Sequence, residues 1–308
     1  MVDLPDLPDC CLLFILAQLP IRTLIQLRLV NKTFYRLCTE SLRGIESLCL
    51  PELLKTSSAS EQATSSTKQH ELRNAVAHFI CSYGSRLRTL HFGPCWLVFG
   101  QQVANAISHT CQSITELNFS SVTFECDISD MLLSLSKQLL VLKLKNASWT
   151  TDSNCRAMQF VLPQMSSLQV LDLECFYSLE PPFDVKSLVA LSPSLRRLNL
   201  SGFVWLCSQQ ILLILEQLRN LVELRLSRLT PCLDGRIICS IASMKCLNIL
   251  EMNNICRSDL QLNNLASLGG SLNQLYLNDN NSLDAPTKMQ IRQACTNLRV
   301  FEAESSNR

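Results

Sequence analysis

The chain has 308 residues, of which 47% are hydrophobic and 17% are charged, and its formal net charge at pH 7 is +1. This balance offers no general attraction to nucleic acid or to anionic membranes, so binding must be local and depend on shape. The longest apolar stretch near the N-terminus, residues 10–17, is too short to span a bilayer. Asp3 and Asp6 precede it where a signal peptide would be basic, so we expect a cytosolic or nuclear protein.

Three short helices are predicted within the first 42 residues. Asp9 can cap the first helix, which ends at Pro20. The apolar positions of this helix include Leu12, Ile15, Leu16 and Leu19. A second helix is predicted over residues 23–28 and a third from about residue 30 toward residue 42. Helices this short expose more aliphatic surface than they can bury, which is typical of a segment that completes its core against a partner.

A hydrophobic phrase, L-x-x-L-x-L, follows and recurs ten times. Its first positions are Ile45, Leu87, Ile114, Leu139, Leu168, Leu195, Leu221, Leu247, Leu272 and Leu298. After one long opening step, the spacing matches that of leucine-rich repeats. Positions four and six are apolar, while positions three, five and seven are mostly polar, which predicts a strand with one buried face. At position eleven, Trp149 and Trp205 are predicted to turn inward.

The segments between the strands predict short helices. Residues 209–218 and 235–244 have an apolar spacing near 3.6, which suits a helix packed on the outer face. One strand and one helix cannot bury their apolar faces alone, so neighbouring units must stack. The sequence therefore predicts an α/β leucine-rich-repeat solenoid, a horseshoe with parallel strands inside and helices outside. The weak tenth phrase, ending in Ala303, fits a C-terminal cap.

The long opening step contains a segment rich in serine and threonine, residues 55–70, with no aliphatic residue larger than alanine. We expect a disordered, mobile insertion here. A solvated loop and a segment regulated by phosphorylation are both compatible with its composition. Helical spacing returns over residues 71–83, which lead into the phrase at Leu87.

No pattern in the chain predicts catalysis or a cofactor. The sixteen cysteines include no C-x-x-C pair, and His78 with Cys81 supplies only two ligands on one helix face, so no metal site is expected. Dinucleotide-binding, P-loop, nucleophile-elbow and H-E-x-x-H motifs are all missing from the sequence. Basic residues do not cluster, which argues against binding of nucleic acid.

The N-terminal segment resembles an F-box. The motif pairs are Leu7-Pro8, Ile15-Leu16 and Leu19-Pro20, followed by Leu24, Leu27 and Val30 before Lys32-Thr33-Phe34-Tyr35. Two positions depart from the family pattern, because Cys11 stands where an aliphatic residue is common and Phe34 where tryptophan is frequent. The resemblance covers residues 4–43. Residues 44–54 hold the first repeat strand and a linker, and after the insertion residues 71–308 resemble the repeat domain of F-box/leucine-rich-repeat proteins.

This resemblance implies that the chain itself catalyses no reaction. In the family, the F-box docks on a Skp-type adaptor of a cullin-RING ubiquitin ligase, and the repeats hold the protein that is ubiquitinated for degradation. The resemblance implies that the adaptor interface is contacted or shaped by Leu7, Pro8, Cys11, Ile15, Leu19, Pro20, Leu24, Leu27 and Val30. We take Ile15 as the anchor of this interface. Some of these residues must instead hold the three helices together, because only a minority of interface residues carry large energies.

Alternate side chains of a strand face opposite sides of the sheet, so positions three, five and seven of each phrase face the concave side of the solenoid. The candidate substrate-binding residues are taken from these positions. The selected positions are His91, Lys143, Asp172, Arg197, Arg225, Glu251 and Tyr276. Their mixed charges favour a folded protein or a charged peptide as the ligand. Ordinary solubility is the alternative, since one face of the strands must be exposed. Arg197, Arg225 and Tyr276 are preferred because arginine and tyrosine are enriched at binding hot spots.

A second interpretation keeps the fold and changes the function. The chain is then a leucine-rich-repeat scaffold without a ligase role, and its N-terminal helices serve as the cap that a solenoid needs. The two interpretations differ in whether the aliphatic side chains of residues 7–37 are exposed or are consumed by packing on the first repeat. The sequence identifies neither the substrate nor any modification that recruits it.

Overall fold

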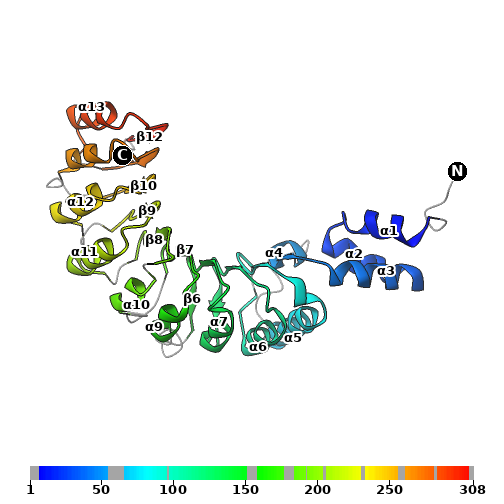
Figure 1. Ribbon diagram of the computed structural model, residues 1–308. Helices are drawn as coiled ribbons and strands as arrows, with labels where there is room; N and C mark the ends of the chain where they lie inside the picture. Colours follow the sequence, from blue (N-terminus) through cyan, green and yellow to red (C-terminus); the bar gives the residue numbers. More distant parts are fainter. Residues whose placement is uncertain are drawn as a thin grey trace.

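The protein folds into an arc of stacked repeats with a small helical unit at its N-terminal end (Figure 1). The computed structural model describes residues 7–54, 66–95, 97–150, 158–176, 184–191, 193–203, 206–229, 233–255, 261–280 and 283–304. Within these ranges a ten-stranded sheet runs in the order β1-β2-β3-β5-β7-β8-β9-β10-β11-β12. All neighbours are parallel, and the order follows the chain, so each repeat stacks on the one before it.

The strands confirm the predicted solenoid and its register. They are β1 (Ser47–Cys49), β2 (Thr89–His91), β3 (Glu116–Asn118), β5 (Val141–Lys143), β7 (Val170–Asp172), β8 (Arg197–Asn199), β9 (Glu223–Arg225), β10 (Ile249–Glu251), β11 (Gln274–Tyr276) and β12 (Val300–Glu302). Equivalent phrase positions pair across the sheet, as where Leu171 lies between Leu142 and Leu198. β12 pairs with β11 at the end of the sheet, where the sequence predicts the cap.

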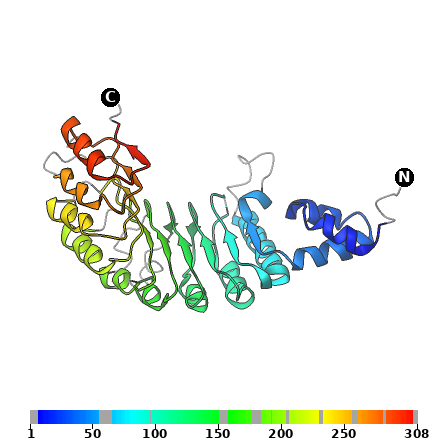
Figure 2. The ribbon, with the colours of Figure 1, turned by 45° about the horizontal axis from the view of Figure 1, so that its top comes forward.

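Helices cover the outer side of the arc (Figures 1 and 2). They are α5 (Ser66–Tyr83), α6 (Gln101–Thr110), α7 (Ser129–Leu135), α9 (Met158–Val161), α10 (Val185–Val189), α11 (Ser208–Gln217), α12 (Gly235–Ala242) and α13 (Ala285–Ala294), with short 3₁₀ turns η2 (Gly84–Arg86), η3 (Leu162–Gln164) and η5 (Leu262–Leu268). The predicted helices at 209–218 and 235–244 are α11 and α12. Among the described residues, no helix combines the length and the apolar character needed to cross a membrane.

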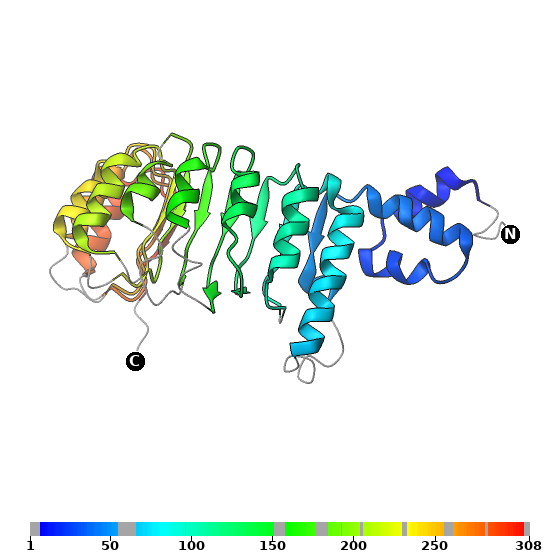
Figure 3. The ribbon, with the colours of Figure 1, turned by 90° about the horizontal axis from the view of Figure 1, so that it is seen from below.

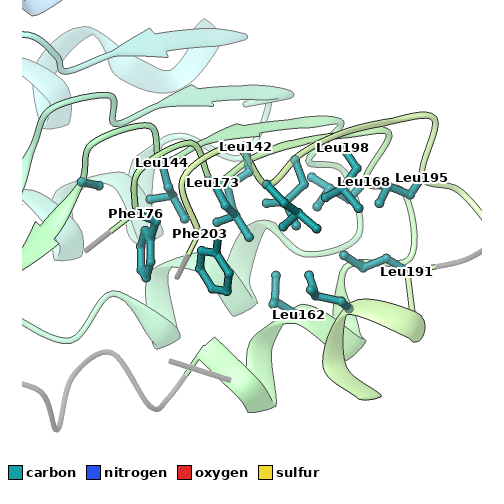
Figure 4. Close-up of a cluster of buried hydrophobic side chains, with 14 of the residues drawn as sticks. Leu142, Leu144, Leu162, Leu168, Leu173, Phe176, Leu191, Leu195, Leu198 and Phe203 are labelled. Atoms are coloured by element: carbon teal, nitrogen blue, oxygen red, sulfur yellow. The ribbon is translucent and has the colours of Figure 1, made fainter. Parts of the chain in front are cut away.

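Leucine side chains form the core between the strands and the outer helices. Leu142 of β5, Leu173 directly after β7 and Leu198 of β8 lie above Leu162 and Leu191 of the outer segments (Figure 4). Each lies in one continuous buried cluster that runs from the first repeat to the last. Burying a leucine side chain contributes about 1.5–3 kcal/mol, so the leucines of the repeated phrase together make a large contribution to the stability of the arc.

A sharp backbone turn recurs after seven consecutive inner strands, from β3 to β11. From the third repeat to the ninth, the residue at position eight has a positive φ: Ser121, Asn146, Cys175, Gly202, Arg228, Asn254 and Asp279, with φ between 49° and 67°. Its amide donates a hydrogen bond to a carbonyl of the following repeat, as from Asn146 to Glu174 (2.8 Å) and from Gly202 to Ser227 (2.8 Å). These bonds offset the cost of the left-handed conformation.

Aromatic rings and a minor sheet reinforce the N-terminal half. β4 (Thr123–Phe124) pairs in parallel with β6 (Ser148–Trp149) outside the main sheet. Trp149 is buried, as predicted, and its ring stacks on Phe124 with 4.5 Å between the centroids. Trp205 lies outside the described residues.

The three predicted N-terminal helices are α1 (Asp9–Leu16), α2 (Ile21–Leu27) and α3 (Lys32–Arg43). The prediction that Asp9 caps α1 is wrong. Pro8 occupies the cap position without a side-chain hydrogen bond, and the Asp9 carboxylate instead pairs with Arg36 of α3 at 2.6 Å. In α3 the cap is Asn31, whose side-chain oxygen accepts from the amide of Phe34 at 2.9 Å.

The predicted insertion at residues 55–70 needs a correction at its C-terminal end. Residues 66–70 belong to α5, which begins at Ser66 and not near residue 71. Gln69 is buried, and its side-chain oxygen accepts a hydrogen bond from the amide of Val98 at 3.2 Å. Burial of this side chain extends the helix beyond what the composition predicts. Residues 55–65 lie outside the described residues. The short helix α4 (Leu50–Leu53) precedes them.

Candidate protein-interaction surfaces

Helix α1 presents apolar residues on both of its faces. Leu12 and Leu16 are buried against α3, while Cys11, Phe14 and Ile15 on the opposite side are exposed. Phe14 is 73% exposed and Ile15 is 40% exposed. A helix that is hydrophobic all round requires cover on every side, and the described residues of this chain cover only one side of α1.

Further exposed apolar side chains lie between α2 and α3 and in the first turn of α3. Leu29 is 87% exposed, and Val30 beside it and Tyr35 in the first turn of α3 are also exposed. We call Phe14, Ile15, Leu29, Val30 and Tyr35 together the N-terminal apolar surface. Large apolar groups on soluble proteins that gather in one small unit mark sites of protein association.

The residues predicted to bind or shape an adaptor interface divide into three groups. Pro8, Cys11, Ile15, Pro20 and Val30 are exposed. Leu24 is buried, so it shapes the surface by packing between the helices. Leu7, Leu19 and Leu27 are partly buried against the same helical core. Phe14 and Leu29 were missed, although the uninterrupted apolar run in α1 was a signal that one face needs an external partner.

The inner side of the helical unit packs on the first repeat. Its core includes Tyr83 from the end of α5, with Phe79 and Ile45 packed around it. The Arg28 guanidinium lies over the rings of Tyr35 (4.7 Å) and Tyr83 (5.7 Å) and so joins the two parts of the chain. Figure 3 shows the helices at the end of the row of repeats. The unit therefore both caps the solenoid and keeps its N-terminal apolar surface exposed.

The predicted concave residues carry a ladder of ion pairs. Glu116 of β3 contacts Lys143 of β5 at 2.9 Å and lies 3.5 Å from His91 of β2. Three strands beyond β5, Glu223 of β9 pairs with Arg225 at 2.7 Å and lies 3.7 Å from Arg197 of β8. Each carboxylate therefore lies between basic groups, at least one of which comes from a neighbouring strand.

Another carboxylate, Glu174, joins its own repeat to three others. Lys145 and Arg228 each contact it at 2.9 Å, and the Asn199 amide donates to it at 3.2 Å. These contacts lower the pKa of Glu174, although burial alone would raise it. The cations thus hold this carboxylate in its ionised form.

Four of the seven predicted concave residues line one shallow hollow of about 280 Å³: Lys143, Asp172, Arg197 and Arg225. Glu174, Glu223 and Lys145 also line it. Burial raises the pKa of Asp172, and the amide of Glu174 donates to its carboxylate at 3.0 Å. The pKa of Arg225 is raised by its hydrogen bond to Glu223 and by the nearby charge of Glu251, against the effect of burial.

The other three predicted concave residues do not line the hollow. His91 lies on β2, three strands from the Asp172 strand. Glu251 accepts from Ser227 at 2.8 Å and pairs with Arg225 at 3.2 Å, one strand beyond the hollow. The Tyr276 hydroxyl donates to Gln274 at 3.2 Å on β11. The structure therefore concentrates the predicted surface on β5 to β9.

The described residues contain no group of three or more histidine, cysteine or acidic side chains placed to hold a metal ion. Burial raises the pKa of Cys111 to about 12 and that of Cys126 to about 11. These thiols therefore stay protonated at neutral pH and act as small apolar core groups.

Comparisons with known proteins identify the N-terminal unit. Residues 4–46 match the family model described as the F-box domain, so the chain contains an F-box. The repeats are similar to internalin C2 of Listeria monocytogenes, with 17% identity, a TM-score of 0.42, and coverage of 75% of this chain and 84% of that one. They are also similar to a chain of the TLR13–ssRNA13 complex, with 15% identity, a TM-score of 0.40, and coverage of 71% of this chain and 33% of that one. No curated protein matches the sequence.

Proposed function

We propose that this F-box/leucine-rich-repeat protein is the substrate-recognition subunit of a Skp-cullin-F-box ubiquitin ligase. F-box domains generally bind Skp-type adaptors and leucine-rich repeats bind proteins, and both kinds of domain are typically non-catalytic. In this proposal the N-terminal apolar surface docks the adaptor, and the concave face holds a protein in the cytosol or nucleus for ubiquitination and degradation.

One observation carries the proposal: the F-box packs on the solenoid and still exposes Phe14, Ile15 and Leu29. If the F-box only capped the repeats, these exposed side chains would not contribute to its stability. Each leaves apolar surface in contact with water, which forgoes about 25 cal/mol of hydrophobic free energy per Å². An adaptor that covers them would recover that free energy. The F-box helices also cover the end of the repeats, because they bury Tyr83 of α5.

The alternative is a protein-interaction scaffold without a ligase role. The burial of Tyr83 under the F-box helices favours it, since this is what a terminal cap does. Cys11 is exposed and Phe34 is partly buried, and both depart from the F-box pattern, so they are the first residues to examine if the adaptor does not bind.

Co-purification of the full-length chain with a Skp-type adaptor tests the proposal. The informative variant is the double substitution Ile15→Asp and Leu29→Asp, because both side chains are exposed in the chain, and a thermal melt checks that the variant is folded. A deletion of the F-box is less useful, since it would uncover Tyr83. We expect stoichiometric capture of the wild type and loss of capture by the variant.

A matched control replaces Leu213 of α11 with aspartate. This side chain is as exposed as Ile15 but lies on the outer face of the repeats. Capture should be unchanged. A folded wild-type chain that captures no adaptor contradicts the ligase proposal and supports the scaffold.

A further inference from the structure

The charges of the concave face are layered by depth. The four carboxylates of its ion pairs are Glu116, Glu174, Glu223 and Glu251, and none has a side chain more than 25% exposed. Their cationic partners are Lys143, Lys145, Arg197, Arg225 and Arg228, and none has a side chain less than 36% exposed. The carboxylates therefore lie at the floor and the cations lie above them.

This layering decides which charge a ligand meets first. The carboxylate oxygens are engaged by the cations, as where Glu174 accepts from Lys145 and Arg228. An ammonium group has three donors and a guanidinium has five, so one contact to a carboxylate leaves each cation further N–H groups to donate. The surface that faces a partner is thus a set of hydrogen-bond donors with positive charge, although the total charge of the face is nearly balanced.

We propose that the hollow on β5 to β9 binds an extended, unphosphorylated acidic segment of the substrate protein, with aspartate or glutamate carboxylates on Lys143 and Lys145 at one side and on Arg197 and Arg225 at the other. This inference rests on the proposed function, because it assigns the chemistry of the protein that the repeats hold. Val170 between the two basic pairs offers an apolar contact to the segment.

The spacing of the cations sets the spacing of the acidic residues. Neighbouring strands lie about 4.8 Å apart, so β5 is about 10 Å from β8 and about 14 Å from β9. An extended chain advances about 3.3 Å per residue and points alternate side chains the same way. Carboxylates at positions i and i+4 are therefore about 13 Å apart. This distance matches Lys143 of β5 and Arg225 of β9, which occupy the same register position. A third carboxylate at i+2, about 7 Å along the segment, lies within reach of the long Arg197 side chain on β8.

The same spacing favours carboxylates over phosphate. A phosphate dianion is best bound where several donors converge on one point. Here Lys145 forms an ion pair with Glu174, and Arg197 and Arg225 form ion pairs with Glu223. The hydrogen-bond donors are therefore distributed along the sheet. Separate single charges fit this arrangement. A single-stranded nucleic acid would need aromatic platforms for its bases, and none lines the hollow among the described residues.

Fluorescence anisotropy with the full-length chain tests the inference. The probe is a labelled nine-residue peptide of alternating glutamate and serine, compared with peptides that carry glutamine or lysine at the same positions. We expect the glutamate peptide to bind at least about 10-fold more tightly than the glutamine peptide, and its affinity to fall as salt is raised from 50 to 300 mM. Equal binding of the glutamate and glutamine peptides overturns the inference.

Two competitors settle the class of ligand. A peptide with phosphoserine in place of the glutamates that binds more than about 10-fold tighter would make phosphate, and not carboxylate, the group recognised. A uridine 12-mer that binds more tightly than the glutamate peptide would overturn a protein ligand at this site. Weaker binding of both supports the acidic segment.

The double variant Lys145→Gln and Arg197→Gln locates the binding site. Both side chains are well exposed, so the fold should survive, and a thermal melt checks this. We expect at least about 10-fold weaker binding of the glutamate peptide. The matched control is Lys137→Gln with Arg219→Gln, two exposed cations on the turns before β5 and after α11. Unchanged affinity in the first variant, or an equal loss in the control, contradicts the assignment.

Adaptor capture from the same samples separates this inference from the proposed function. Peptide binding without adaptor capture supports the acidic segment and contradicts the ligase proposal. Adaptor capture without peptide binding supports the ligase proposal and overturns the acidic segment. The Lys145→Gln, Arg197→Gln variant should lose the peptide and keep the adaptor, since the two surfaces lie on different parts of the fold.

Discussion

The F-box and the concave face offer two different kinds of surface. The F-box exposes large apolar side chains such as Phe14 and Leu29, whereas the concave strands expose lysine and arginine above paired carboxylates. Apolar contact is non-directional and strong for its area, which suits a long-lived partner. Hydrated ion pairs contribute less affinity and more selectivity, which suits a ligand that must be released.

The two regions also differ in what their apolar residues do. In the solenoid, the leucines of each phrase are buried against other residues of the same chain, as Leu171 is between Leu142 and Leu198. In the F-box, similar residues divide between an internal core and an exposed face. Substitutions should therefore affect stability in one region and association in the other.

The largest effect is expected in the solenoid core. Leu171→Ala removes a fully buried side chain from the middle of the sheet and should lower the free energy of unfolding by about 3 kcal/mol, because a cavity remains. Urea denaturation measures it, with the exposed Leu213→Ala as the control. An equal effect of both substitutions would mean that the centre of the arc is not the cooperative core described here.

In the F-box, the proposed function predicts that Ile15→Asp weakens adaptor binding by at least about 2 kcal/mol, or roughly 30-fold, because a charge would then lie in the proposed desolvated interface. The free energy of unfolding should hardly change, since Ile15 is exposed in the free chain. Calorimetric titration of the adaptor measures the affinity, beside Leu213→Asp. Affinity equal to that of the wild type would remove Ile15 from the interface.

A smaller effect is expected at the cap of α3. Asn31→Ala removes the acceptor for the Phe34 amide and should destabilise the F-box helices by about 1 kcal/mol. Hydrogen exchange of the α3 amides should then accelerate about fivefold, while the amides of β8 and β9 keep their rates. The neighbouring substitution Lys32→Ala is the control. Uniform acceleration throughout the chain would show that the F-box does not unfold on its own.

The smallest effect is expected at Asp172, whose pKa is raised by burial. A carboxyl group with a raised pKa in the folded state costs stability above that pKa, and this cost disappears as the pH falls below the ordinary aspartate range. Asp172→Asn should therefore raise the free energy of unfolding at pH 7 by less than about 1 kcal/mol. This gain corresponds to an increase in Tm of less than about 2 °C. The gain should vanish toward pH 3. A gain that grows in acid would contradict the direction of the pKa shift.

The solenoid could be predicted from the sequence because the same hydrophobic pattern recurs in every repeat. Each phrase predicts the buried positions of one strand, and the constant step predicts that the strands stack in register. The start of α5 was not readable, since the serine-rich composition conceals that Gln69 packs inward and bonds to Val98. Asp9 was misassigned as a cap because residue type alone cannot show that Arg36 competes for it.

The interaction surfaces were only partly readable for a related reason. Strand parity places Lys145 and Glu174 on the concave side, but the sequence does not show that Arg228, 54 residues from Glu174, completes their cluster. Phe14 and Leu29 have the same residue types as core positions. Only the packed structure shows which members of an apolar run, such as Leu12 and Phe14 in α1, lack a partner within the described chain.

The contact of Arg28 with Tyr35 and Tyr83 has a consequence for where ubiquitin is attached under the proposed function. Since the F-box is packed on α5 and not tethered by a free linker, the direction of the concave face relative to the adaptor is a property of the fold. A bound protein is then presented in one orientation, and the lysines on the side that faces the ligase have a much higher effective concentration than the others. The choice of modified lysine would thus follow from geometry at this junction, and not from the sequence around the lysine.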